Sequence, residues 1–246
     1  MKVDVNADLG EGFGPYRIAD DEALMRIVTS ANIACGFHAG DPQTMDRMVG
    51  LAKDLGVAVG AHVGYPDRVG FGRRQMAVSP ADLRNDVLFQ LGALAAFAKV
   101  HGTRVAHLSP HGALGNLASA DRSVAEAIVS AASAFDPDIA YLTMTGTAME
   151  DIVRERGLKS ISSFLADRAY LNDGQLVPRS RAGAVVKDIS AIRDRVRRAV
   201  SDGEVETIDG AILKIEVQSV LVHSDTPNAV SIAMAVKDAI GASRAD

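Results

Sequence analysis

The chain has 246 residues, with 26 Lys or Arg against 31 Asp or Glu, so its formal net charge is −5 at neutral pH. This acidic balance argues against a nucleic-acid binder, which needs a basic surface. Hydrophobic residues make up 48% of the chain and charged residues 23%, which allows a sizeable core and excludes a disordered protein.

Short apolar runs alternate with helical patterns along the chain. Seven runs rich in Val, Ile and Leu are expected as strands, near Val3–Asn6, Ala31–Ala34, Val57–Ala61, Val105–Leu108, Ile139–Leu142, Ser160–Phe164 and Val220–His223. Helices are expected near Asp21–Val28, from Asp41-Pro42 to Gly56, from Ser79-Pro80 to Gly102, and near Ser119–Ala134, Ala148–Arg156, Ser190–Val200 and Pro227–Ile240. Nearly continuous apolar strands are typical of a parallel sheet covered on both faces, and the alternation indicates βα units throughout.

One segment departs from this alternation. Residues Glu204–Val217 are expected to form a β-hairpin, because Asp209-Gly210 suits a two-residue turn between alternating apolar and charged residues. No linker or composition break divides the chain. Since (β/α) barrels run to about 250 residues, we predict a single barrel domain over residues 1–246.

The single cysteine, Cys35, permits no intrachain disulfide and excludes a zinc site built from several thiolates. The N-terminal residues carry charge where a signal peptide needs an apolar stretch. The longest apolar run, around Leu91–Ala98, is far shorter than the roughly 20 residues that span a bilayer. We therefore expect a cytoplasmic protein without a membrane partner.

Four of the six histidines directly follow predicted strands: His38, His62, His111 and His223. A lone histidine is more often structural, but four at equivalent positions favour a shared site, because barrel enzymes carry their chemistry at the C-terminal ends of the strands. Imidazole titrates near pH 6.5 and suits general acid–base catalysis or metal ligation. We expect these four rings and Asp8 to line one cleft.

Two predicted loops, His62–Ser79 and Leu165–Asp188, are longer than usual βα connections. They hold six arginines, namely Arg68, Arg73, Arg74, Arg168, Arg179 and Arg181. Guanidinium groups suit carboxylate or phosphate ligands, so the loops predict an anion site. A second arginine group, Arg193, Arg195, Arg197 and Arg198, is expected on the solvated face of a helix. The sequence has neither a P-loop nor a complete dinucleotide-binding motif, so nucleotide binding has no motif of its own here.

Seven blocks of sequence resemble the LamB/YcsF family. They are Asn6-x-Asp8-Leu9-Gly10-Glu11, Ser30–Pro42, Gly60-Ala61-His62, Gly70-Phe71-Gly72-Arg73-Arg74, Pro110–Leu114, Ala166–Tyr170 and Asp225-Thr226-Pro227. The resemblance implies an α/β fold, an irregular (β/α)7 TIM-like barrel of the glycoside hydrolase/deacetylase type. The family is assigned as the A component of the bacterial ATP-dependent 5-oxoprolinase. That assignment implies opening of the lactam of 5-oxo-L-proline to L-glutamate, ATP with Mg²⁺ as its counter-ion, and partner subunits B and C.

The resemblance also implies which residues line the site. The catalytic candidates are Asp8, Glu11, His38, His62 and His111. The substrate-binding candidates are Asp41, Arg73, Asp167, Arg168, His223 and Asp225. We expect Asp8 or Glu11 to act with His62 in acid–base catalysis, and Arg73 or Arg168 to hold the substrate carboxylate or the phosphoryl group.

The sequence departs from the family pattern at five positions. Ser109 stands where Lys is usual, Gly115 where Tyr is usual, Ser163 where Glu is usual, Ala7 where Cys is usual and Ser224 where Gly is usual. Losing a cation, a phenol and a carboxylate near one site leaves the exact lactam open.

Two rival functions remain at this point. One is a metal-dependent deacetylase-like hydrolase, in which Asp8, His38 and His62 are the natural metal triad. The other is a non-catalytic substrate-binding protein whose partners perform the chemistry. The sequence also leaves open whether a divalent metal binds, where ATP binds and whether the chain forms a homo-oligomer.

Overall fold

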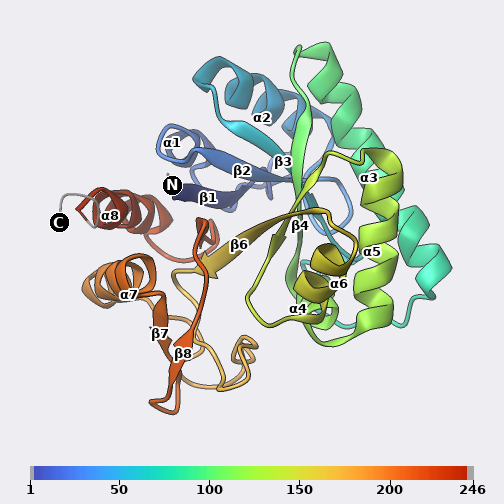
Figure 1. The fold of residues 1–246 in the computed structure, drawn as a ribbon. Helices are drawn as coiled ribbons and strands as arrows, with labels where there is room; N and C mark the ends of the chain where they lie inside the picture. The colour runs from blue at the N-terminus through green and yellow to red at the C-terminus, as the bar shows by residue number, and fades with distance from the viewer. Residues whose placement is uncertain (1–2, 243–246) are drawn as a thin grey trace.

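The computed structural model describes residues 3–242. Within these residues seven parallel strands close into a barrel in the order β1-β2-β3-β4-β5-β6-β9, with β9 paired to β1 (Figure 1). The barrel strands are β1 (Asp4–Leu9), β2 (Ser30–Ala34), β3 (Ala58–Val63), β4 (Val105–Pro110), β5 (Ala140–Thr143), β6 (Lys159–Leu165) and β9 (Ser219–Val222). The predicted (β/α)7 barrel is therefore confirmed. The single domain over residues 1–246 stays a prediction, since its two ends lie outside the described residues.

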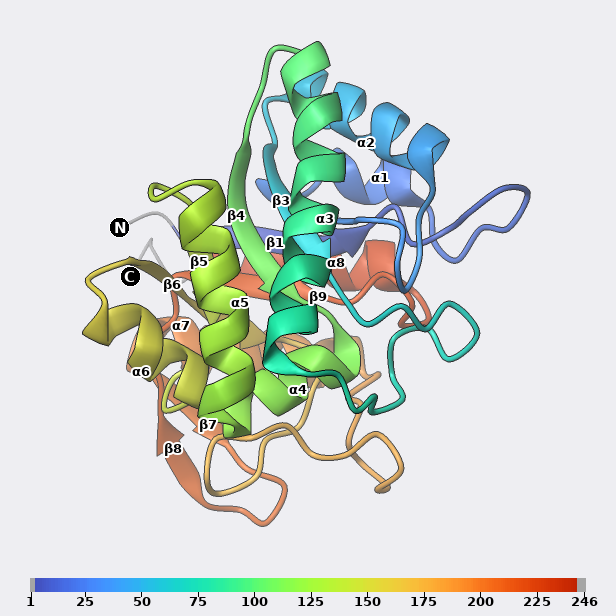
Figure 2. The same ribbon diagram turned by 90° about the vertical axis from the view of Figure 1, so that its right-hand side faces the viewer.

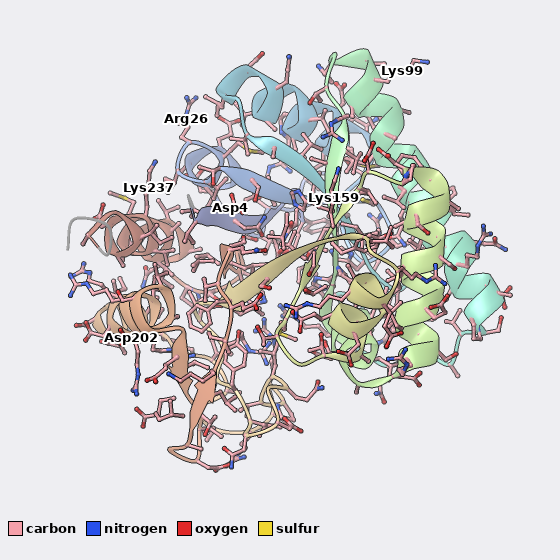
Figure 3. All side chains as sticks on the ribbon, in the orientation of Figure 1. Asp4, Arg26, Lys99, Lys159, Asp202 and Lys237 are labelled. Atoms are coloured by element: carbon pink, nitrogen blue, oxygen red, sulfur yellow. The ribbon has the colours of Figure 1, made fainter. Side chains whose placement is uncertain are left out.

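Helices cover the outside of the barrel. They are α1 (Asp21–Met25), α2 (Pro42–Leu55), α3 (Pro80–Val100), α4 (Gly112–Ala120), α5 (Arg122–Phe135), α6 (Ala148–Glu155), α7 (Ile189–Asp202) and α8 (Ala229–Ala242). Helix α3 packs on α5, and α7 packs on α8 (Figure 1). The charged groups Arg26, Lys99 and Lys237 point outward from this layer (Figure 3).

The helix boundaries follow from local hydrogen bonds of capping residues that can be recognised in the sequence. The Asp41 carboxylate accepts the Thr44 backbone N–H at 2.7 Å and starts α2, and Gly56 ends it in the left-handed conformation. The Ser79 hydroxyl accepts the Asp82 N–H at 3.1 Å and starts α3. The expected boundaries of these two helices are confirmed.

Two other helices differ from expectation. The predicted helix Ser119–Ala134 is wrong at its start, because Asp121 adopts an extended conformation and caps a new helix, α5, through Ser123 N–H at 2.8 Å. The residues before it form α4, a helix that the sequence pattern did not reveal. Helix α1 ends at Met25 rather than Val28, because the chain turns there so that the Thr29 N–H reaches the Val5 carbonyl at 2.8 Å.

The predicted hairpin exists but has a longer turn. Strands β7 (Glu204–Glu206) and β8 (Ile212–Lys214) pair in antiparallel fashion, with Glu206 opposite Ile212. The Thr207 N–H donates to the Ala211 carbonyl at 2.8 Å, so the expected two-residue turn is wrong, although Gly210 supplies the left-handed residue. The hairpin lies on the opposite side of the molecule from α2 (Figure 2).

The expectation of a solvated Arg195 is also wrong. Its guanidinium donates to the Arg168 carbonyl at 2.7 Å and lies over the Phe164 ring, 5.8 Å from the ring centre. Burial accordingly lowers the pKa of Arg195 below its usual value. Of the other three arginines on α7, Arg197 is exposed, whereas Arg193 and Arg198 are half-buried.

Five barrel strands, β1, β3, β4, β5 and β6, run further toward their C-terminal ends than predicted, whereas β2 ends at Ala34 as predicted and β9 ends one residue early. Asp8 lies within β1 and His62 within β3, whereas the sequence pattern places both just beyond a strand. Both side chains are buried, because they point into the barrel interior and find polar partners there. The placement of functional residues at strand ends is unchanged by this shift.

The interior of the barrel is polar at the level of β1 and β2. Asn32 donates to the Asn6 side-chain oxygen at 2.6 Å and to Asp8 Oδ1 at 2.9 Å. The His107 Nε2–H donates to Asn32 Oδ1 at 2.8 Å. Barrel interiors are usually filled with branched apolar residues, so this network is an exception whose members must satisfy one another.

No helix within residues 3–242 combines the length and the apolar character that crossing a bilayer requires.

We predict opposite effects for two Gly→Ala substitutions. A Cβ at Gly60 on β3 would overlap the buried His107 ring, so Gly60→Ala should lower the free energy of unfolding by about 1–3 kcal/mol. A Cβ at Gly92 on the exposed face of α3 meets nothing within 4 Å, so Gly92→Ala should raise it by about 0.5–1 kcal/mol. Urea denaturation of both variants measures this, and equal effects would contradict the packing described.

Candidate active site

A cavity of about 350 Å³ opens at the C-terminal ends of the barrel strands. This volume falls in the range of small-molecule sites, roughly 300–1,000 Å³. Asp8, His62, His111 and His223 line it, so four of the five side chains expected in one cleft reach this cavity. The fifth, His38, is fully buried behind its wall and stacks on His111, with ring centres 3.8 Å apart.

One carboxylate and three imidazoles converge at the inner wall of the cavity. Glu11 Oε1 lies 3.3 Å from His38 Nε2, 3.4 Å from His111 Nδ1 and 3.8 Å from His62 Nε2. We call Glu11, His38, His62 and His111 the inner-wall cluster. Asp8 lies beside it, with Oδ1 3.4 Å from His62 Nε2.

Backbone carbonyls fix two of the three rings. His62 Nδ1 lies 2.9 Å from the Ser109 carbonyl, and His111 Nε2 lies 2.8 Å from the Phe71 carbonyl. A carbonyl only accepts, so each of these nitrogens carries the ring proton. The lone pairs on His62 Nε2 and His111 Nδ1 therefore face each other across 2.9 Å.

The loops that carry Glu11 and His38 are anchored by side chains from other segments. The Gly10 N–H donates to Asp21 Oδ1 at 3.1 Å, which holds the loop after β1. Arg68 donates to the Gly36 carbonyl at 2.6 Å and so holds the loop after β2. The sequence predicts that Arg68 binds an anion, whereas in the structure its guanidinium donates to backbone carbonyls of this loop.

The segment Gly70–Arg73 folds over the inner-wall cluster. Gly72 has a positive φ of 62°, and a Cβ there would come within 2.7 Å of the His38 Cβ and 2.8 Å of His111 Cδ2. Only glycine allows so close an approach. The same loop supplies the carbonyl that orients His111 and carries Arg73 to the cavity.

Burial sets the protonation of the inner-wall cluster. Desolvation, followed by the charges of Asp8 and Asp225, raises the pKa of Glu11 well above its usual value. Desolvation lowers the pKa of His62 and holds that of His111 well below its usual value. In the absence of a bound cation, both imidazoles are therefore neutral at pH 7.

Three arginines line the same cavity: Arg73, Arg168 and Arg179. Arg73 donates to Asp225 Oδ2 at 2.7 Å and lies over the Phe71 ring. Burial lowers the pKa of Arg168 to about 10, and that group donates to the Val177 carbonyl at 2.6 Å. Arg74 and Arg181 are elsewhere, paired with Asp67 and with Asp209.

His223 is oriented by a buried carboxylate. Its Nδ1 lies 2.7 Å from Asp167 Oδ1, while the Thr226 hydroxyl donates to Asp167 Oδ2 at 2.5 Å. Burial would raise the pKa of Asp167, but the charge and hydrogen bond of His223 outweigh this, so the pKa is below its usual value. His223 itself lines the cavity.

Asp41, a predicted substrate-binding residue, makes local backbone contacts. Its carboxylate caps α2 and accepts the Gly14 N–H at 2.6 Å, and like Asp167 and Asp225 it is not among the residues that line the cavity. Cys35 is buried and donates to the Ile33 carbonyl at 3.2 Å. Burial raises the pKa of Cys35 to about 12, so its thiol stays protonated near neutral pH.

Asn32, which holds Asp8, was not identified from the sequence, whereas Arg179 belongs to the arginines expected at an anion site and does line the cavity. A polar residue inside an apolar strand was the available signal for Asn32. Ser109, Gly115 and Ser163, three positions at which the chain departs from the family pattern, all line the cavity. The buried Ser163 hydroxyl has no hydrogen-bond partner within residues 3–242, which leaves it available to a ligand.

The donor set also differs from the expected metal triad. One donor atom from each member of the inner-wall cluster lies within 4.8 Å of those of the other three. His38 and His62 belong to this set as expected, whereas Glu11 and His111 take the place of Asp8.

Comparisons with known proteins identify the family of the chain. The model of the LamB/YcsF family matches residues 3–246. A protein of Agrobacterium fabrum, named as the A 2 subunit of 5-oxoprolinase, is 50% identical over 245 residues, covering 100% of this chain and 96% of its own. One of Ralstonia nicotianae with the same name is 53% identical over 232 residues, covering 94% and 89%. The crystal structure of a lactam utilization protein from Thermus thermophilus is 45% identical and superposes with a TM-score of 0.92, covering 98% and 97%.

We predict that acid destabilises the fold through His107, which supports Asp8 by way of Asn32. Burial lowers the pKa of His107 to about 4, against an ordinary value of 6.5. Between these values the unfolded chain binds a proton that the folded chain does not. This one residue should therefore lower the free energy of unfolding by about 1.4 kcal/mol for each pH unit below 6.5. The loss should end near pH 4.

Urea denaturation at pH 7.5, 6.0 and 5.0 measures this slope. His107→Gln should show a shallower dependence than the wild type, and identical slopes would contradict the assignment.

Proposed function

Because the chain belongs to the LamB/YcsF family, we propose that it is the A subunit of an ATP-dependent 5-oxoprolinase. In this proposal it opens the lactam ring of 5-oxo-L-proline to give L-glutamate, in the cytoplasm, together with partner subunits B and C. The names of the relatives support this assignment, since they specify part of a 5-oxoprolinase in two cases and a lactam utilization protein in the third.

One structural observation carries the proposal: the cavity has acid–base groups and arginines on its walls together. Asp8 and His62 offer a carboxylate and a neutral imidazole, and Arg73 lies in the same cavity. A cyclic amide that carries a carboxylate needs both kinds of group, one for proton transfer and one for its charge. Leu142, Leu176 and Leu221 add apolar surface suited to the methylenes of a small ring.

The chemistry requires activation because resonance makes an amide a poor electrophile. ATP, when bound with Mg²⁺, supplies this activation at the amide oxygen. The chain's own groups then move protons and hold charge. Asp8 accepts the proton of the attacking water, held in position by the hydrogen bond from Asn32.

His62 shares the proton transfer with Asp8. Its Nδ1–H is fixed on the Ser109 carbonyl, so Nε2, which lies 3.4 Å from Asp8 Oδ1, takes over the water-derived proton from Asp8 and passes it to the ring nitrogen as the C–N bond breaks. Arg73 and Arg168 hold the substrate carboxylate or the phosphoryl group. These roles follow from position in the cavity, and general acid–base catalysis of this kind contributes about 10²–10⁴-fold.

Two alternatives share this cavity. Ser109, Gly115 and Ser163 favour a different lactam, since these residues alter the lining of the cavity while Ser109 holds His62 through its backbone carbonyl. The inner-wall cluster favours a metal-dependent hydrolase of the deacetylase type. Turnover of a panel of lactams separates the first from the proposed function, and metal dependence separates the second.

We predict that the purified chain alone does not release glutamate from 5-oxoproline, even with ATP and Mg²⁺. The relatives are named as subunits, and acid–base catalysis alone falls far short of usual enzymatic accelerations of 10⁶-fold or more. Addition of subunits B and C should restore turnover. The measurement is glutamate release with each of the three proteins omitted in turn, and robust turnover by the chain alone would overturn the partner dependence.

Arg73→Ala should lower kcat/KM in the reconstituted enzyme by about 10- to 150-fold, because a hydrogen bond to a charged group contributes about 1.5–3 kcal/mol. Arg181→Ala is the matched control, since this exposed arginine pairs with Asp209 away from the cavity. Unchanged kinetics in Arg73→Ala would remove Arg73 from substrate binding.

A further inference from the structure

We infer that the inner wall of the cavity binds a divalent cation of the zinc type. Its donors are one carboxylate and three imidazoles, those of Glu11, His38, His62 and His111. The inference deepens the proposed function and rests on it for the substrate, but cation binding itself needs no substrate.

Four of the six donor pairs are spaced close to the distance of a tetrahedral site, and all the donor atoms lie within 4.8 Å of one another. Zinc binds histidine nitrogen at about 2.0–2.1 Å, which places neighbouring donors of a tetrahedron about 3.3 Å apart. Glu11 Oε1 is 3.3 Å from His38 Nε2 and 3.4 Å from His111 Nδ1. The pairs that include His62 Nε2 scatter around the same value, at 2.9 Å to His111 Nδ1 and 3.8 Å to Glu11 Oε1.

The outer hydrogen bonds of two rings are those of metal-bound histidines. A ligating imidazole characteristically donates its other N–H to a carbonyl or carboxylate, which fixes the tautomer and aims the lone pair. His62 does this through the Ser109 carbonyl and His111 through the Phe71 carbonyl. Both rings are buried, and both are aimed at the same point.

Two nitrogen lone pairs that face each other at this distance need a proton or a cation between them. His62 Nε2 and His111 Nδ1 are both acceptors and lie 2.9 Å apart, so a bond between them requires an additional proton. A cation between them satisfies both nitrogens and Glu11 at once. His38 Nε2 lies 3.3 Å from Glu11 Oε1, but its ring stacks nearly parallel on His111, so His38 must turn about its side-chain bonds to direct this nitrogen at the same cation.

The donor chemistry selects the ion. Three nitrogens and one oxygen suit Zn²⁺, whereas Mg²⁺ prefers oxygen ligands and retains its waters. The Mg²⁺ that accompanies ATP is therefore expected elsewhere. The thiol of Cys35 is engaged with the Ile33 carbonyl and does not belong to the set.

Cation binding would change the roles of the nearby groups. His62 Nε2 becomes a ligand and no longer carries a proton. Proton transfer then passes to Asp8, which lines the cavity and keeps its hydrogen bond from Asn32.

The test is direct binding of Zn²⁺ to the full-length chain, prepared without a histidine tag and freed of metal by a chelator. Isothermal titration calorimetry gives the stoichiometry, and elemental analysis after gel filtration gives the retained metal. Co²⁺ serves as a spectroscopic probe, because a tetrahedral site produces intense visible absorption. We expect one equivalent of Zn²⁺, a tetrahedral Co²⁺ spectrum and no displacement by millimolar Mg²⁺.

Variants identify the donors. His62→Ala and the nearly isosteric Glu11→Gln should each weaken Zn²⁺ binding by more than about 100-fold, beyond the 10- to 100-fold that loss of an outer partner costs. Cys35→Ala is the control for the thiol and His101→Ala the control for a surface histidine, and both should bind as the wild type does. Circular dichroism of each metal-free variant establishes that it is folded.

Absence of stoichiometric Zn²⁺ binding in the wild type would overturn the inference. Unchanged binding in both folded donor variants would do the same. Full 5-oxoprolinase turnover by the reconstituted, metal-free chain would leave the proposed function standing and remove the cation from it. One equivalent of bound Zn²⁺ without turnover of 5-oxoproline would support the site and reject the substrate.

Discussion

The site depends on one constraint: carboxylates and imidazoles are buried at the end of a closed barrel, and each needs a fixed polar partner there. Asn32 occupies the centre of this arrangement. It donates to Asp8 and to Asn6, and it accepts from His107. An unpaired polar group in such an interior costs about 1–3 kcal/mol, so the network tolerates few changes and holds Asp8 in one orientation.

The loops around the cavity are likewise held by fixed polar partners. Asp21 holds the loop that carries Glu11, and Arg68 holds the loop that carries His38. Asp21 begins the helix that follows its loop, whereas Arg68 is 32 residues from Gly36 in sequence. Pairing of β2 with β3 brings the Arg68 segment to the loop after β2, so the barrel itself positions this part of the site.

The fold was predictable because its signals are local. Asp41 and Ser79 are capping residues that indicate where helices begin, and apolar runs indicate strands. The site was predictable in outline, since residues at strand ends of a parallel barrel meet at one end. The individual partners were not, because Asn32 and the Phe71 carbonyl act through contacts that only closure of the barrel creates. The burial of Arg195 was hidden for the same reason, since its partner, the Arg168 carbonyl, belongs to a different loop.

In this cavity backbone carbonyls orient the histidine rings, whereas side chains form the surface that a ligand meets. The Ser109 carbonyl orients His62, so the side chain at position 109 is free to vary without moving that ring. The Phe71 carbonyl does the same for His111. The positions that depart from the family pattern, among them Gly115 and Ser163, contribute side-chain surface to the cavity and are not part of the inner-wall cluster. Changes at such positions therefore act on what the cavity accepts, while the backbone continues to hold the groups that perform the chemistry.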